Sequence, residues 1–174
     1  MPLSAEDIRR AFVGLSEELE RRQRRAEIVV VGGAAIVLLY GARESTKDVD
    51  AYFVEPEASV IRAAAEAVAS RLELPGDWLN DAAKAYMVDV TTGDILFESP
   101  SLGIRAASNA QLLAMKLAAW RDAIDRTDAR LLLERMTGTR EEIWAGVKRF
   151  VPQHLVDKAS YAFDDLWETC HGTD

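Results

Sequence analysis

Two aspartates, Asp48 and Asp50, are the side chains whose type and spacing point most directly to chemistry. In an extended strand, residues two positions apart lie on the same face. These carboxylates are therefore expected side by side, with Val49 on the opposite face. Neighbouring carboxylates repel each other unless a cation lies between them. Their oxygen atoms suit Mg²⁺, especially when substrate phosphates complete the coordination. The alternative is a solvated strand end that binds nothing.

A Gly-Gly pair comes before the aspartates and offers a place for phosphate groups. Gly32 and Gly33 follow an apolar run and precede a segment of helical length. A glycine lets the backbone approach a ligand closely, and N–H groups at the start of a helix bind phosphate oxygens. Arg43 and Thr46 lie between the glycines and the aspartates. Arg43 is either a planar donor to a phosphate or part of a surface ion pair.

A lysine and two further aspartates form a second group of candidates. Lys116 interrupts an otherwise apolar segment. Three alternatives are open for its amine. It extends along the helix surface into water, it points at a ligand, or it pairs with an aspartate. Asp125 and Asp128 are three residues apart, so they would be neighbours on one face of a helix.

These segments, in this order, resemble the polymerase-β-type nucleotidyltransferase superfamily. Within it, they are most similar to small bacterial proteins related to AbiEii-type toxins of type IV toxin–antitoxin systems. The resemblance covers roughly residues 26 to 135. It rests on the Gly-Gly turn, on Arg43-x-x-Thr46-x-Asp48-Val49-Asp50, on Asp77 to Lys84, on Ala107-Ser108 with Leu112 to Lys116, and on Arg121 to Asp128 with Leu131 to Leu133.

The resemblance implies a fold, a reaction and partners. The expected fold is α/β (α+β), with a small mixed β-sheet packed with helices and followed by an α-helical C-terminal part. The implied reaction is metal-dependent transfer of an NMP from an NTP to an acceptor hydroxyl. Asp48 and Asp50 would hold Mg²⁺ in a two-metal site, and Gly32 and Gly33 would hold the phosphates. The implied acceptor is tRNA or another macromolecule, and the implied partner is a cognate antitoxin.

The same resemblance gives roles to the remaining candidates. The nucleotide site would also be lined by Arg43, Thr46, Asn80 and Asp81. The catalytic group would be completed by Lys116, Asp125 and Asp128. A third metal-binding carboxylate is expected from one of three residues, namely Asp81, Asp89 or Asp94.

Two other functions are consistent with the sequence. The same fold could nucleotidylate a protein or a small molecule. It could also bind a nucleotide or a partner protein without turnover. This second alternative is suggested by the residue after Gly32, because many transferases of the superfamily carry a serine there and this chain does not.

Strands and helices must position these side chains. Helix starts are indicated by the capping residues Ser4 (with Asp7), Asp77, Ser108 and Thr139. We expect strands at 27–31, 49–54, 87–90 and 94–98. We expect helices at 4–25, 34–40, 57–72, 78–85, 109–122, 128–136, 139–150 and 152–167. The change to all-helical sequence near Ala107 divides the chain into 1–106 and 107–174, which are expected to form one compact unit.

Composition limits the partners. The net charge of −8 and the pI of about 4.9 lack the basic character of a protein that binds nucleic acid mainly through phosphates. The basic residues at 21–25 form either a solvated helix end or a local RNA-facing patch. No apolar run reaches the ~18 residues that a membrane span needs. One cysteine, Cys170, and the absence of a signal-peptide-like start favour the cytoplasm.

Overall fold

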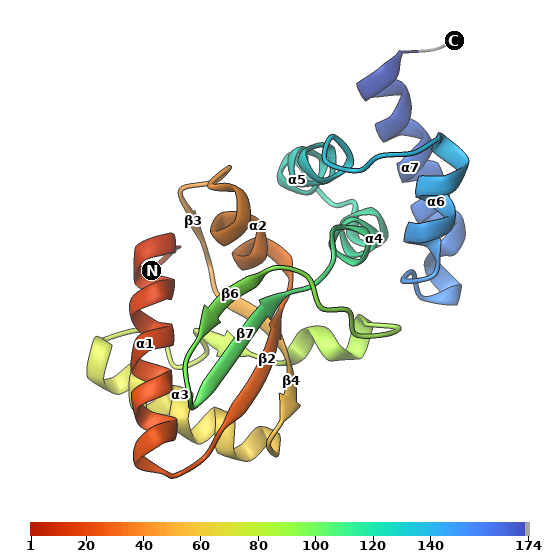
Figure 1. Ribbon diagram of the computed structural model, residues 1–174. Helices are drawn as coiled ribbons and strands as arrows, with labels where there is room; N and C mark the ends of the chain where they lie inside the picture. The colour runs from red at the N-terminus through yellow and green to blue at the C-terminus, as the bar shows by residue number, and fades with distance from the viewer. Residues whose placement is uncertain (173–174) are drawn as a thin grey trace. The chain divides into compact units, whose positions relative to one another are not determined.

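The computed structural model describes residues 1–172 and divides the chain into two compact units (Figure 1). The first unit holds Met1–Ala85 and Thr92–Ala107. The second holds Tyr86–Thr91 and the chain from Ser108 onward. The expected fold class, a small mixed sheet with packed helices and a helical C-terminal part, is confirmed.

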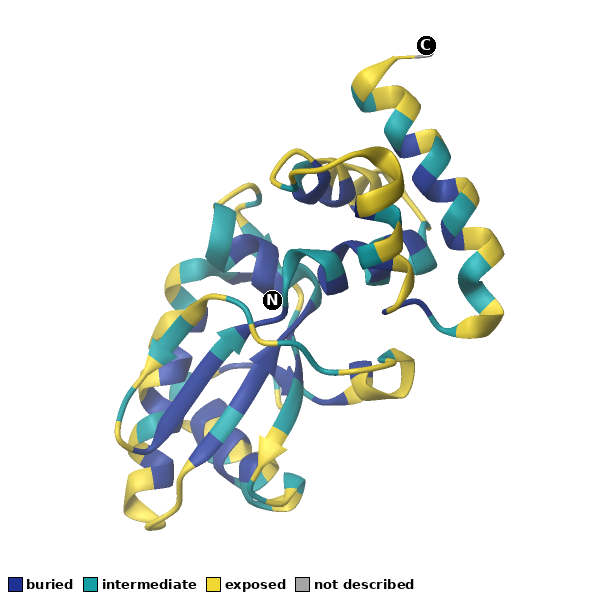
Figure 2. Ribbon diagram, turned by 45° about the vertical axis from the view of Figure 1, so that its right-hand side comes forward, coloured by how far each residue is buried: buried dark blue, intermediate teal, exposed yellow. Residues whose placement is uncertain are grey.

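A five-stranded mixed sheet forms the centre of the first unit, in the order β5-β4-β2-β7-β6. The strands are β2 (Ala26–Val30), β4 (Val49–Glu55), β5 (Leu79–Asn80), β6 (Ile95–Glu98) and β7 (Leu102–Ala106). β2 runs antiparallel to β4 and parallel to β7. Figure 2 shows buried residues along the central strands, where the sequence is rich in Val, Ile and Leu.

Three helices accompany this sheet, namely α1 (Ala5–Arg21), α2 (Gly32–Tyr40) and α3 (Ala58–Leu72). α1 begins at a capping box, because the Ser4 hydroxyl accepts a hydrogen bond from the Asp7 N–H and the Asp7 carboxylate accepts one from the Ser4 N–H. Its apolar stripe is fully buried, as its helical spacing predicts: Ile8, Phe12, Leu15 and Leu19. α1 and α3 pack against each other, and the Phe12 ring lies 6.4 Å from that of Trp78.

A second, two-stranded sheet joins the N-terminus to the loop before β4. β1 (Leu3–Ser4) pairs antiparallel with β3 (Ser45–Thr46), and the register places Leu3 opposite Thr46. Figure 1 shows the start of the chain beside β3 and α2. The chain between α2 and β4, residues 41–48, is thus held at its middle as well as at its ends.

Up to residue 172, the second unit contains four α-helices, namely α4 (Asn109–Ala119), α5 (Ala123–Leu133), α6 (Arg140–Lys148) and α7 (Val156–His171). α4 is central and packs against the other three. The expected caps Ser108 and Thr139 are present, and each accepts a hydrogen bond from the backbone N–H three residues on. Among the described residues, no helix is both long and apolar enough to cross a membrane.

Two of the expected elements are wrong, and a third begins earlier than expected. Residues 78–85 do not form a helix starting at Asp77, because Leu79–Asn80 pair with β4 as strand β5 and only Ala82–Tyr86 form a short 3-10 helix. Residues 87–90 are not a strand. Helix α5 starts five residues before the expected 128, because the Asp122 side chain caps it by accepting from the Asp125 N–H.

Candidate functional site

The two aspartates lie at the start of strand β4. Asp50 is in the strand, Asp48 directly precedes it, and both are half-buried, whereas Val49 between them is fully buried. Burial raises the pKa of Asp48 above its ordinary value, and the neighbouring charge of Asp50 raises it further. The two carboxylates are therefore close enough to repel each other.

The Gly-Gly turn meets these aspartates because β2 and β4 are antiparallel. Val30 at the end of β2 lies opposite Ala51 near the start of β4, and the Val31 N–H donates to the Asp50 carbonyl oxygen at 2.9 Å. Gly32 follows with a φ of +64°, a conformation that glycine adopts without strain. A Cβ at Gly32 would lie 3.3 Å from the Asp50 carboxylate oxygen Oδ2. The start of α2 and the second aspartate are thus in contact.

Arg43 and Thr46 lie against the second glycine. A Cβ built at Gly33 would collide with Nη2 of Arg43 and would lie 2.9 Å from Oγ1 of Thr46. The Thr46 hydroxyl also donates to the backbone oxygen of Asp48 at 3.3 Å. Four of the expected nucleotide-site residues, from two separate segments, therefore meet in one place: Gly32, Gly33, Arg43 and Thr46.

Adding one methyl group at Gly33 should disrupt this arrangement. We expect Gly33→Ala to lower the free energy of unfolding by only ~1 kcal/mol, because the added Cβ displaces the flexible end of the Arg43 side chain but also crowds Oγ1 of Thr46, which would lie 2.9 Å away. The double variant Gly33→Ala with Arg43→Ala should recover the part of the loss that comes from Arg43. Gly76→Ala is the control, since a Cβ there meets no atom within 4 Å. Urea unfolding of the four proteins measures the effect, and equal stability of Gly33→Ala and wild type would contradict it.

Asn80 lies beside the first aspartate, whereas Asp81 is held by cations. Strand β5 places Asn80 opposite Asp50, and its Nδ2 lies 3.5 Å from Oδ2 of Asp48. The Asp81 carboxylate accepts from Nη2 of Arg62 at 2.7 Å and lies 3.2 Å from Nζ of Lys84. The pairing of Arg62 with Asp81 could not be predicted from the sequence, because the two residues are nineteen positions apart and lie on different elements.

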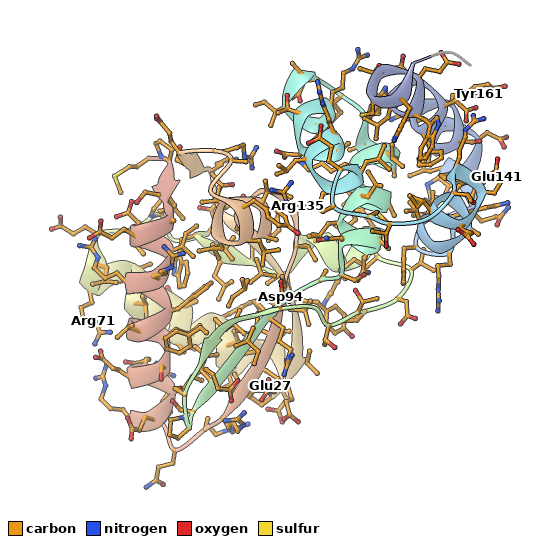
Figure 3. All side chains as sticks on the ribbon, turned by 45° about the horizontal axis from the view of Figure 1, so that its top comes forward. Glu27, Arg71, Asp94, Arg135, Glu141 and Tyr161 are labelled. Atoms are coloured by element: carbon orange, nitrogen blue, oxygen red, sulfur yellow. The ribbon has the colours of Figure 1, made fainter. Side chains whose placement is uncertain are left out.

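The other two candidates for a third carboxylate are exposed. Asp94 lies in the first unit, directly before β6, where its backbone oxygen accepts from the Ala106 N–H (Figure 3). Asp89 lies in the second unit, and its Oδ1 accepts from the N–H of Val90. Within residues 1–172, no group of three or more His, Cys, Asp or Glu side chains is arranged to hold a metal ion.

The Asp81 ion pairs should make stability depend on pH. The hydrogen bond from Arg62 holds the pKa of Asp81 below its ordinary value of 3.8. A carboxylate with a lowered folded-state pKa stabilises the fold above its unfolded pKa, and this contribution is lost as the pH falls through the folded value. We therefore expect Asp81→Asn to be less stable than wild type at pH 7 and to lose less stability on acidification. Thermal melts across the acid range measure this, and parallel pH curves for the two proteins would refute it.

Two carboxylates suit a hard cation at the aspartate pair. The donors near it are the oxygens of Asp48 and Asp50, with the Asn80 amide close by. Carboxylate oxygens are the ligands that Mg²⁺ prefers, and Mg²⁺ commonly takes one or two protein carboxylates together with water and phosphate oxygens. A bound cation would also relieve the repulsion that raises the pKa of Asp48. The residues therefore fit Mg²⁺.

Lys116, Asp125 and Asp128 form a buried ion cluster within the second unit. The Nζ of Lys116 lies 3.0 Å from Oδ1 of Asp125 and 2.8 Å from Oδ2 of Asp128. The exposed fractions of the side chains are 12%, 3% and 1%, so all three charges are removed from bulk water. Burial opposes ionisation of Asp125, but hydrogen bonds from Lys116 and Arg121 outweigh it and hold the pKa of Asp125 below its ordinary value.

A tight turn brings these charges together. Trp120 ends α4 in a left-handed conformation with a φ of +37°, and its N–H donates to the Lys116 carbonyl oxygen. The cap residue Asp122 then starts α5 two residues later. Of the alternatives expected for Lys116, pairing with an aspartate is the one that its contacts show. Lys116 pairs with both Asp125 and Asp128.

A mixed sheet in which a glycine turn opens a helix beside paired aspartates on the next strand is the arrangement of a nucleotidyltransferase-like protein. The comparison with protein families agrees. The model of the family described as "Nucleotidyltransferase of unknown function (DUF6036)" matches residues 10–133, and the chain belongs to this family. The matched range ends at Leu133, the last residue of α5, and so includes every candidate residue named above. No curated protein matches the chain significantly.

Proposed function

We propose that the protein transfers a nucleoside monophosphate from an NTP to an acceptor hydroxyl, and that Asp48 and Asp50 hold the Mg²⁺ that the reaction needs. The observation that carries the proposal is the contact between the start of α2 and the second aspartate, where a Cβ at Gly32 would lie 3.3 Å from the Asp50 carboxylate. Phosphate groups bound at the glycine turn would therefore lie next to the acidic pair.

Each residue of this site has a task in the proposal. The backbone N–H groups at Gly32 and Gly33 begin α2, and such groups bind phosphate oxygens. Arg43 supplies a guanidinium beside Gly33, which suits the planar recognition of phosphate. The Asp48 and Asp50 carboxylates would hold the Mg²⁺. When bound there, Mg²⁺ neutralises phosphate charge and polarises the phosphoryl group for attack.

Lys116 remains the proposed cation for charge that develops on the transferred phosphoryl group. The two aspartates that hold its amine, Asp125 and Asp128, would fix its position in this role. The same contacts also give Lys116 a structural task, so its catalytic task needs a test that separates the two.

The proposed biological setting is that of a toxin with a cognate antitoxin and a tRNA acceptor. Its support is the resemblance to AbiEii-type toxins. The arginines near residues 21–25 give it no support, because their side chains pair with carboxylates of the same unit: Arg21 and Arg22 with Glu18, Arg24 with Glu57, and Arg25 with Glu27.

A second candidate function is nucleotide binding without turnover. It is favoured by the sequence after Gly32, which lacks a hydroxyl, and by Asp81, whose carboxylate is occupied by Arg62 and Lys84. In this case the acidic pair would bind Mg²⁺ with the nucleotide, but no transfer would follow.

Labelled-nucleotide transfer tests the proposal. The protein is incubated with each of the four α-labelled NTPs and Mg²⁺, with total RNA, purified tRNA, total protein or no acceptor. Label on RNA supports the tRNA setting, and label on protein supports the alternative acceptor. Mg²⁺-dependent binding of a non-hydrolysable NTP without any transfer supports the binder. Failure of every NTP to bind in the presence of Mg²⁺ would refute both functions.

A further inference from the structure

The N-terminal strand lies against the loop that carries the proposed phosphate contacts. β1 (Leu3–Ser4) pairs with β3 (Ser45–Thr46), and β3 lies between Arg43 and Asp48 in the chain. Leu3 is opposite Thr46 in the register, and its side chain is fully buried. A fully buried leucine only two residues after Met1, which is 72% exposed, indicates that this short strand is firmly packed.

Ser4 connects this strand rigidly to helix α1. Its hydroxyl donates to Oδ2 of Asp7 at 2.7 Å and accepts from the Asp7 N–H at 3.1 Å, while its own N–H donates to the same carboxylate at 3.0 Å. The backbone at Ser4 is therefore fixed on the helix side by the capping box and on the loop side by β3. α1 is itself packed through its fully buried stripe.

Thr46 transmits this restraint to the site. Its Oγ1 would lie 2.9 Å from a Cβ at Gly33, and it donates to the backbone oxygen of Asp48 at 3.3 Å. The residue that faces Leu3 across the β1–β3 pair is thus also the residue that contacts both the glycine turn and the first aspartate.

We propose that β1 is a clamp for residues 41–48, and that Leu3 is a positioning residue for nucleotide binding. This inference rests on the proposed function. Without the clamp, residues 41–48 would be anchored only where α2 ends and β4 begins, so Arg43 and Thr46 would occupy their places beside Gly33 for less of the time.

The effect should appear in affinity rather than in the rate of the chemical step. When only a fraction of molecules is competent to bind, the apparent dissociation constant rises by the inverse of that fraction. A loop that holds its bound geometry for about one tenth of the time would weaken binding about tenfold. Once the nucleotide is bound the loop is ordered again, so kcat should change little.

The test compares Leu3→Ala with Leu19→Ala. Both variants remove the same atoms from fully buried leucines of the first unit, but Leu19 lies near the opposite end of α1. We expect Leu3→Ala to raise the KM, or the dissociation constant of a non-hydrolysable NTP with Mg²⁺, about tenfold, with kcat nearly unchanged. Leu19→Ala should lower the Tm about as much as Leu3→Ala does, but it should leave the nucleotide affinity unchanged. Leu3→Ile should have nearly the nucleotide affinity of wild type.

Hydrogen exchange of the full chain provides a measurement that needs no ligand. Leu3→Ala should speed amide exchange at residues 43–48 selectively, whereas Leu19→Ala should not. Unchanged exchange in this loop, or equal affinity losses for both alanine variants, would overturn the clamp. If wild type binds no NTP while the loop still exchanges faster in Leu3→Ala, the proposed function fails and the role of Leu3 in nucleotide binding fails with it.

Discussion

Replacing Asp50 by alanine is expected to abolish Mg²⁺-dependent nucleotidyl transfer while leaving the fold intact. Asp50 is the aspartate that contacts the glycine turn, so its loss removes a metal ligand at the place where phosphates are proposed to bind. Losing one preorganised electrostatic contact typically costs ~10²–10³-fold in kcat, and we expect at least this loss. The protein should be as stable as wild type or slightly more stable, because Asp50 no longer adds its repulsion to the burial that raises the pKa of Asp48.

Transfer of labelled NMP and thermal unfolding are measured on the same preparations. Glu66→Gln serves as the control. Glu66 is an exposed carboxylate on α3, and its replacement removes one negative charge, as Asp50→Ala does. An Asp50→Ala protein with normal transfer would show that the metal site lies elsewhere. Loss of folding in Asp50→Ala would show that Asp50 has a structural role, and Asp50→Asn would then be the variant to assay.

Replacing Lys116 by methionine is expected to give the largest loss of stability. The change keeps most of the side-chain volume but leaves Asp125 and Asp128 buried without their shared cation. Breaking a buried ion pair by removing one partner costs ~3–5 kcal/mol. Chemical unfolding at pH 7 measures the effect, with Lys148→Met as the exposed control on α6. A loss no larger than that of the control would contradict the prediction.

The pH dependence of this loss has a definite sign. The pKa of Asp125 is held below its ordinary value of 3.8, so the cluster stabilises the fold above that value and its contribution fades as the pH falls through the folded pKa. Removing Lys116 takes away the charge that keeps the carboxylate ionised. The difference in stability between wild type and Lys116→Met should therefore be greatest near neutral pH and should shrink in acid.

A compensated variant separates the structural task of Lys116 from its proposed catalytic one. Combining Lys116→Met with Asp125→Asn and Asp128→Asn removes all three buried charges, and such replacements are often neutral or stabilising. If this stable variant transfers NMP normally, Lys116 is structural only. If it is stable and binds NTP but transfers nothing, the cluster of Lys116, Asp125 and Asp128 takes part in catalysis, as the proposed role of Lys116 requires.

Locally determined features of the fold could be predicted from the sequence. The caps Ser4, Ser108 and Thr139 were predictable because each bonds a backbone N–H only three residues away. That the glycine turn lies next to the acidic pair could be predicted only from the resemblance to nucleotidyltransferases. The order of these residues along the chain did not show it. The structure supplies its cause, namely the antiparallel pairing of β2 with β4.

Features that depend on distant residues could not be predicted. Strand β7 was missed because Gly103 and Arg105 weaken its strand pattern, yet Gly103 is opposite Glu27, whose carboxylate fills the space where a side chain would lie. Strand β5 exists only through its pairing with β4. One of the two cations that hold Asp81, namely Arg62, is likewise distant in the sequence.

The chain passes from the first unit to the second, back to the first and again to the second, and this limits which segments can be exchanged between related proteins. Residues Tyr86–Thr91 belong to the second unit although β6 and β7 follow them in the first. They are fixed there by Gln111, whose buried amide accepts from the N–H and hydroxyl of Thr91 and donates to the Asp89 carbonyl oxygen. A fragment starting at Ser108 would leave this amide without these partners, at a cost of ~1–3 kcal/mol. The units are therefore not consecutive modules, and a chimera between relatives should exchange Tyr86–Thr91 together with the C-terminal helices.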